Sequence, residues 1–277
     1  MQIVDAQVHV WGPETAERPW APGRHPHRAA PLEANELLRE MDRAGVARAI
    51  LVPPSWDADR NDYVLAAARR HPERFAAVGR FNPEAPGARA QVEHWLDEPG
   101  MLGMRTTFTL AQKAALVEGR IDWLWQEAEA AQVPVMALIS HAMVPLIDDI
   151  AARHPCLKLS LCHLALPTDV RDDAAFAGFD KLLLLARRPN VSVMASCLPA
   201  YTSQPYPFAY LHPYIRQVVE AFGPQRVFWG TDLARLPCPY GEAVKLFTEA
   251  LPWLSEADQA QIMGRALCEW LNWPLPQ

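Results

Sequence analysis

The sequence predicts an α/β fold in which residues 1–277 form a single (β/α)8 TIM barrel with a long loop after the first strand. Short, apolar, β-branched segments alternate with amphipathic segments at a period of roughly 30 residues, as in βαβ units. Eight such strands are expected, and a chain of 277 residues has the usual size of one closed barrel. An open, doubly wound sheet is the competitor, but the first turn lacks G-x-G-x-x-G.

The expected strands are short and rich in Val, Ile, Leu and Ala, as buried parallel strands usually are. They cover residues 3–10, 48–53, 75–81, 102–108, 133–139, 157–161, 191–196 and 226–231. Amphipathic spacing predicts helices between them, the first ending at Gly45 and the second before Pro72. These helices cover residues 32–44, 62–71, 87–97, 121–131, 144–154, 176–188, a segment ending at 222, 242–251 and 256–271.

Residues 11–31 connect the first strand to the first helix, and this segment is too long for an ordinary βα turn. The segment is polar and rich in proline, and it contains His25, His27 and several arginines. Long loops at the carboxyl end of a barrel strand commonly carry functional groups. We therefore expect residues 11–31 to form a lid or rim over the mouth of the barrel.

Composition limits the classes of partner and the compartment. The net charge is −6 without a basic cluster, which disfavours nucleic acid and anionic membranes as partners. No apolar run reaches the roughly 18 residues that span a bilayer, and the N-terminus does not resemble a signal peptide, so we expect a cytoplasmic protein. Five scattered cysteines without CxxC spacing predict reduced thiols. The expected partner is a small-molecule substrate, with a homodimer possible through the Trp-rich ends (Trp253, Trp270, Trp273), which could equally cover the barrel bottom.

Polar side chains gather where the expected strands end. Gln7 and His9 share one face of the first strand, and Asp232 follows the last strand. If these strands are neighbours in a closed barrel, the three side chains converge at its mouth, where such barrels carry their chemistry. The other candidates at strand ends are Arg80, Asn82, Arg105, Thr107, Ser140, His141, His163 and Ser196.

This combination of groups suits acid and base catalysis of hydrolysis. Asp232 can take a proton from water while an imidazole polarises a carbonyl, and Arg80 or Arg105 can bind a substrate anion. Each residue also has a structural interpretation, since His9 could be a hydrogen-bonded core residue and Asp232 a helix cap. Arg105 could pair with a core carboxylate such as Asp5. Their joint occurrence at the ends of separate strands favours function.

Several motifs, in order along practically the whole chain, resemble the amidohydrolase superfamily. They are D-A-Q-V-H-V-W at 5–11, G-M-R at 103–105, A-R-H-P at 152–155, C-H-L-A-L-P at 162–167, Y-P at 206–207 and G-P-Q-R-V-F-W-G-T-D at 223–232. The last motif is the most specific. The pattern is similar to the amidohydrolase-related (type 2) branch of lactonases and decarboxylases, closest to 2-pyrone-4,6-dicarboxylate lactonase and the sugar or muconolactone lactonases.

The resemblance implies a TIM-barrel hydrolase that opens a small carboxylated or hydroxylated lactone. Asp232 would activate water, and His163, with His9 as a second candidate, would polarise the carbonyl. The substrate-binding residues would be Gln7, Arg80, Arg105, His141 and Tyr206.

The resemblance also bears on a metal. In this family the first strand usually ends in His-x-His, but Gln7 stands at the first of these positions, and Leu138 aligns with the usual histidine after strand five. Since an amide oxygen is a poor ligand for zinc, we expect no cofactor. One alternative is a single divalent ion, Zn or Mn, held by His9, His163 and Asp232, for amide hydrolysis or non-oxidative decarboxylation. Another is a catalytically silent barrel that acts as a binding or partner subunit.

Overall fold

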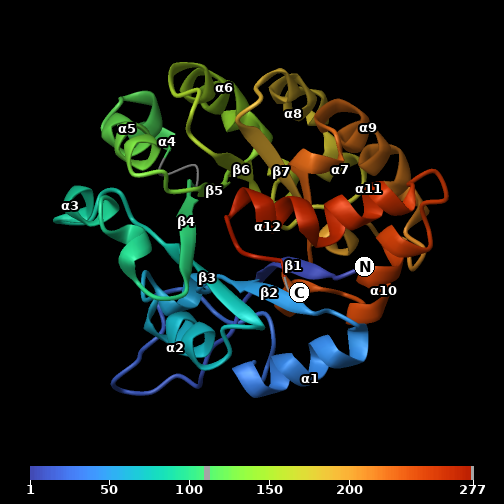
Figure 1. Cartoon of the computed structure of the whole chain (residues 1–277), viewed down its shortest axis with the longest axis horizontal. Coiled ribbons are helices and arrows are strands. Elements are labelled where there is room, and N and C mark those ends of the chain that lie inside the picture. The colour runs from blue at the N-terminus through green and yellow to red at the C-terminus, as the bar shows by residue number, and fades with distance from the viewer. Residues whose placement is uncertain (109–112, 276–277) are drawn as a thin grey trace.

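The computed structural model, which describes residues 1–108 and 113–275, confirms the predicted barrel. Its described strands form one parallel sheet in sequence order, and the backbone N–H of Asp232 donates to the carbonyl of Gln7 at 2.9 Å, so the last strand meets the first (Figure 1). The eight strands are β1 (Val4–Val8), β2 (Arg48–Leu51), β3 (Phe75–Arg80), β4 (Met101–Thr107), β5 (Val135–Leu138), β6 (Leu159–Leu161), β7 (Val191–Ser196) and β8 (Val227–Gly230).

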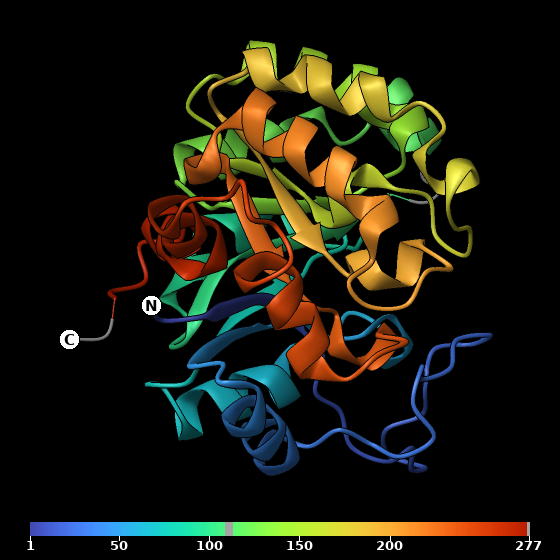
Figure 2. The same ribbon diagram turned by 90° about the vertical axis from the view of Figure 1, so that its right-hand side faces the viewer.

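Helices surround the sheet, as the turned view shows (Figure 2). They are α1 (Ala34–Ala44), α2 (Asp62–Arg70), α3 (Ala88–Val92), α4 (Lys113–Val117), α5 (Asp122–Ala130), α6 (Val144–Arg153), α7 (Asp173–Phe176), α8 (Phe179–Leu184), α9 (His212–Phe222), α10 (Tyr240–Thr248), α11 (Glu256–Ala260) and α12 (Ala266–Trp270). In α1, Leu37 and Met41 form the buried stripe, and Gly45 ends the helix with a φ of 72°. No described helix is long and apolar enough to cross a membrane.

Three expected helices are broken. The helix expected over residues 87–97 becomes α3 followed by a 3-10 turn, and that over 176–188 is divided by Gly178, whose φ is 83°. A π-helical stretch, Gln261–Arg265, separates α11 from α12. There Gly264 packs so close to β1 that a Cβ atom would lie 2.8 Å from Val4 Cγ2, which requires glycine.

The amino end of the barrel is closed by the end of the chain. Trp273 is buried and stacks on the Arg48 guanidinium at 3.6 Å, while Trp270 contacts the ring of Phe228. Both tryptophans belong to an apolar cluster with inward-facing strand residues such as Ile50, so they cover the barrel bottom. All five cysteines lie in the described residues and are unpaired, as expected. The free opening is therefore at the carboxyl ends of the strands.

Candidate active site

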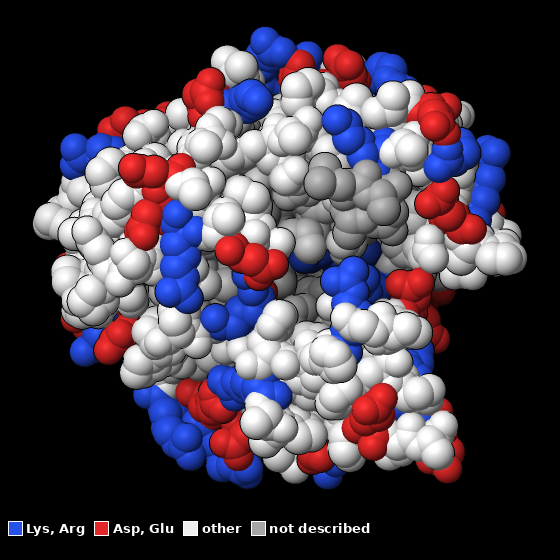
Figure 3. Space-filling model, turned by 180° about the vertical axis from the view of Figure 1, so that it is seen from behind, with Lys and Arg blue, Asp and Glu red and all other residues white. Residues whose placement is uncertain are grey.

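A cavity of about 480 Å³ lies at the carboxyl ends of the strands. Seen from behind the view of Figure 1, away from α12, the surface is hollowed, with Lys and Arg side chains around the hollow (Figure 3). The predicted lid contributes to the cavity wall. Strand-end residues on the wall are Gln7, His9, Arg80, Arg105, Thr107, Leu138, His163 and Asp232, and loop residues include Ala21, Arg24, His27, Trp56, Asp59, Asp169 and Arg235.

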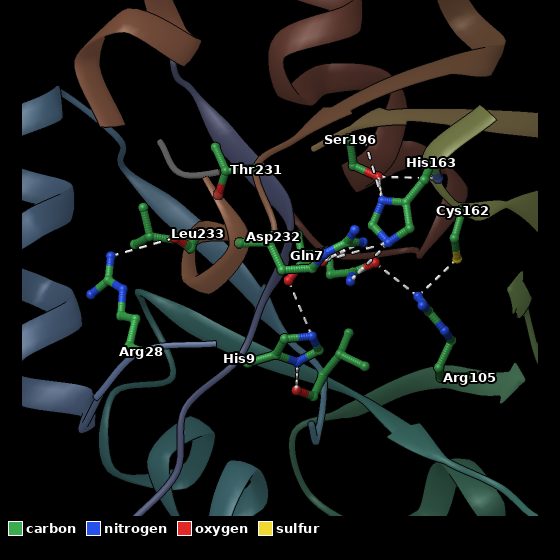
Figure 4. Close-up of polar contacts among 12 residues, drawn as sticks. Gln7, His9, Arg28, Arg105, Cys162, His163, Ser196, Thr231, Asp232 and Leu233 are labelled. Carbon is green, nitrogen blue, oxygen red and sulfur yellow. Dashed lines mark hydrogen bonds and ion pairs between the residues drawn. The ribbon is translucent and has the colours of Figure 1, made fainter. Parts of the chain in front are cut away.

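Asp232 is the centre of the polar groups (Figure 4). It is buried, and its backbone adopts a left-handed conformation with a φ of 48°, which turns the chain sharply after β8. The Nε2 atom of His9 lies 3.2 Å from its Oδ1, and the Nε2 atom of His163 lies 3.6 Å from its Oδ2. The structure thus brings together three predicted catalytic side chains from distant parts of the sequence.

The charge state of this centre follows from its surroundings. Burial by itself would raise the pKa of the Asp232 carboxyl, but His9, His163 and Arg235 outweigh burial and hold that pKa well below its usual value. Burial lowers the pKa of His163 to about 3, against the opposing charge of Asp232. Asp232 is therefore an ionised carboxylate next to a neutral His163 ring at neutral pH.

His9 has a fixed orientation. Its Nδ1 atom lies 2.7 Å from the carbonyl oxygen of Val52, which can only accept a hydrogen bond. The ring proton therefore sits on Nδ1, and the Nε2 atom is directed at Asp232. The structural interpretation of His9 is correct for one ring nitrogen, while the other faces the cavity centre.

Gln7 and Arg105 form a second polar group beside His163. Arg105 Nη1 donates to Gln7 Oε1 at 2.8 Å and to the Cys162 sulfur at 2.8 Å. The amide nitrogen of Gln7 lies 3.5 Å from His163 Nε2. The alternative that Arg105 pairs with a core carboxylate such as Asp5 is wrong, because Asp5 accepts from Thr231 and Tyr240 instead.

Five polar atoms of the cavity wall are buried without a hydrogen-bond partner in the described part of the chain. They are Trp56 Nε1, Arg80 Nε, Arg105 Nε, Thr107 Oγ1 and Asp232 Oδ1. Burial, aided by the nearby charge of Arg105, lowers the pKa of Arg80 to about 10, and its closest carboxylate, Asp59, is 3.8 Å away. Unsatisfied polar groups of this kind are expected where a polar ligand binds.

Two residues predicted to bind substrate lie outside this cavity. His141 lies in the 3-10 turn after β5, where its ring nitrogens face the carbonyls of Leu164 and Ala177, at 3.1 and 3.3 Å. Tyr206 lines a separate cavity of about 270 Å³ beside Cys238. At the end of β5 it is the apolar Leu138 that reaches the main cavity.

The alternative role of Asp232 as a helix cap is also wrong, since its side chain makes no capping hydrogen bond. Arg235 was not predicted, although its Nη1 lies 3.8 Å from Asp232 Oδ2 and the spacing of three residues could have revealed it. Asp59, Asp169 and Trp56 were also missed, because they come from loops whose course the strand pattern does not define.

The donor set does not fit a tightly held divalent ion. Within residues 1–108 and 113–275, no three His, Cys, Asp or Glu side chains are grouped closely enough to hold one. The oxygen of Gln7, the only ligand atom that side chain could offer, already accepts from Arg105. A guanidinium in that position adds positive charge where a metal ion would need negative charge.

Comparisons with known proteins identify the family and the fold. A family model described as "Amidohydrolase" matches residues 4–266. An L-fucono-1,5-lactonase from Burkholderia ambifaria is 23% identical over 251 residues, which cover 86% of this chain and 83% of the relative.

Two solved structures share the fold. An amidohydrolase from Burkholderia multivorans with bound zinc superposes with a TM-score of 0.82 at 21% identity, covering 99% of this chain and 100% of the other. A probable 2-pyrone-4,6-dicarboxylic acid hydrolase from Acinetobacter baumannii with bound citric acid has a TM-score of 0.77 at 14% identity. The superposition covers 98% of this chain and 100% of the other.

Proposed function

The chain belongs to the amidohydrolase family and is a hydrolase, and we propose that its substrate is a small lactone. The name of the Burkholderia ambifaria relative, a lactonase, supports this substrate class. So does the name of the Acinetobacter structure, since 2-pyrone-4,6-dicarboxylic acid is also a cyclic ester.

The observation that carries the proposal is the buried carboxylate of Asp232 between the Nε2 atoms of His9 and His163. Asp232 takes a proton from water, and the resulting hydroxide attacks the carbonyl carbon of the lactone. The ring C–O bond then breaks, and the proton returns from Asp232 to the leaving alkoxide. The product is the open-chain hydroxy acid, and no other reactant is consumed.

The charges of the cavity favour a substrate with many hydroxyl groups and at most one carboxylate. Arg80 faces Asp59 and Arg235 faces Asp232, each at 3.8 Å, so these two cations are already balanced by anions. Asp169 adds a further negative charge to the wall. Carboxylates and guanidinium groups together can bind hydroxyl groups, whereas a dicarboxylate would bring its second negative charge near the acids of the wall.

A metal-dependent reaction is the second candidate, because the Burkholderia multivorans structure contains zinc. Metal analysis of protein purified without added ions separates the two candidates. We expect well below one equivalent of zinc or manganese and unchanged activity after treatment with a chelator. One tightly bound equivalent, lost together with activity, would show that the ion is required.

The direct test is a panel of lactones assayed by proton release. It should contain L-fucono-1,5-lactone, other hydroxylated lactones and lactones with one or two carboxylates. We expect turnover of hydroxylated lactones and much weaker turnover of dicarboxylates. If no lactone is hydrolysed, the protein is better explained as a silent barrel that binds a ligand or a partner.

A further inference from the structure

Arg105 is a buried cation of the cavity wall without a carboxylate partner among the described residues. The residue is 4% exposed, and the ion pairs of two other cavity arginines, Arg80 and Arg235, do not extend to it. Its partners are neutral, the oxygen of Gln7 and the sulfur of Cys162, and its Nε has no partner there. A buried charge without a counter-charge is costly, so its presence in a cavity wall indicates that a ligand supplies the negative charge.

The hydrogen bonds of Arg105 also determine the tautomer of His163. A guanidinium can only donate, so the amide oxygen of Gln7 must face Arg105, and its NH2 group must face His163 Nε2, 3.5 Å away. On the other side of the ring, Nδ1 lies 2.8 Å from the Ser196 hydroxyl, which can donate or accept, and 3.3 Å from the Ser196 carbonyl oxygen, which can only accept. The Gln7 amide group and the Ser196 carbonyl favour a ring proton on Nδ1 and a lone pair on Nε2, and the Ser196 hydroxyl can accept the same Nδ1 proton.

A lone pair on Nε2 has a chemical consequence. His163 can accept a hydrogen bond from the attacking water, but it cannot donate one to a lactone carbonyl through Nε2. His9 is no substitute, because any proton on its Nε2 is directed at Asp232 Oδ1, 3.2 Å away. The sequence-based role of His163 as the group that polarises the carbonyl therefore does not suit this arrangement.

We propose that Arg105 polarises the lactone carbonyl and stabilises the oxyanion of the tetrahedral intermediate, while Gln7 keeps His163 as a hydrogen-bond acceptor. This inference rests on the proposed lactone hydrolysis. Attack of water puts the negative charge on the former carbonyl oxygen, next to the guanidinium. Collapse of the intermediate re-forms the C=O bond, expels the ring oxygen and returns the proton from Asp232 to it.

The kinetic test compares Arg105→Ala with Arg80→Ala on the best lactone of the panel. Loss of a single oxyanion donor typically lowers kcat by roughly 10²- to 10³-fold, and we expect this for Arg105→Ala with only a small change in KM. Added guanidinium chloride should restore part of the lost kcat. Arg80→Ala, the matched loss of a cavity arginine, should act mainly on KM.

Two further readouts keep the test decisive. If Arg105→Ala does not fold, Arg105→Lys replaces it, and we expect it to retain a minor part of kcat. Nitrogen-15 spectra of the wild-type protein, with His163 assigned by His163→Gln, should show the Nδ1–H tautomer.

The results that would contradict the role of Arg105 differ from those that would contradict the proposed function. A protonated Nε2 in neutral His163, or an arginine variant that keeps kcat and only raises KM, would overturn the role of Arg105. A wild-type protein without activity on any lactone would instead overturn the proposed function itself.

Discussion

Two carboxylates on the seam between β1 and β8 are almost completely buried, yet their surroundings are opposite. Asp5, below the mouth, accepts hydrogen bonds from neutral donors of Gln7, Thr231 and Tyr240, and burial raises its pKa to about 6. Asp232, at the mouth, faces His9, His163 and Arg235, which hold its pKa well below the usual value. Burial alone therefore does not mark a reactive acid. A reactive acid is marked instead by cationic and imidazole partners at the edge of a cavity.

The largest expected effect is on catalysis and follows from removing the Asp232 carboxylate. Asp232→Asn removes the proton acceptor and should lower kcat for lactone hydrolysis by roughly 10²- to 10⁴-fold. The control is Asp148→Asn, which changes a carboxylate on α6 that pairs with Arg187 and Arg188. Steady-state kinetics of both variants decide the matter, and an Asp232→Asn variant as active as the control would contradict the assignment.

The next effect is on stability and concerns Asp5. Asp5→Ala leaves the buried donors of Thr231 and Tyr240 without an acceptor and should lower the free energy of unfolding by about 3 kcal/mol. In a chain of this size, that loss corresponds to a fall in Tm of roughly 6–12 °C. Asp148→Ala, which removes a partly buried carboxylate paired with Arg187 and Arg188 near the surface, should cost less, about 1 kcal/mol. Equal melting temperatures for the two variants would show that Asp5 does not stabilise the junction of β1 and β8.

A third effect is the pH dependence of stability. Asp5 keeps its proton up to about pH 6 in the folded chain, whereas the unfolded chain releases it near 3.8. The folded state therefore binds more protons in this window, and the contribution of Asp5 to stability falls as pH rises from about 4 to 6, by at most about 3 kcal/mol.

The measurement is urea unfolding of the wild-type protein and Asp5→Asn at several pH values in that window. The difference between the two free energies isolates Asp5 from the other carboxylates. It should change steadily from pH 4 to 6 and level off above, whereas two parallel curves would place the pKa of Asp5 near that of the unfolded chain.

The smallest expected effect tests whether the active site extends to Tyr206. Tyr206 lines the separate cavity, so Tyr206→Phe should change KM for the lactone by no more than about twofold, the effect of roughly 0.5 kcal/mol. A tenfold rise in KM in steady-state assays would mean that the substrate extends from the main cavity into the second one.

The sequence was informative where strand position alone decides a side chain's direction. Alternation along the first strand and the carboxylate after the last one are enough to place His9 and Asp232 at a common mouth, once the barrel closes. The alternation also placed Gln7, although not its contact with Arg105, which depends on how two long side chains meet across the barrel.

Residues beyond strand ends could not be placed in this way. The 3-10 turn after β5 directs His141 toward backbone carbonyls, a local geometry that a strand pattern does not contain. Arg235, Asp59 and Asp169 reach the cavity from loops, and their positions depend on tertiary packing. Likewise, the break between α11 and α12 follows from the close contact of Gly264 with β1.

The central claim is that Asp232, His9 and His163 act on one small molecule in one cavity. A crystal structure of the Asp232→Asn variant with an intact hydroxylated lactone tests it most directly. The lactone carbonyl should lie between the imidazoles, within reach of the position-232 side chain and with its oxygen toward Arg105. A lactone bound in the cavity beside Tyr206, with the space around His9 and His163 left to solvent, would contradict the account.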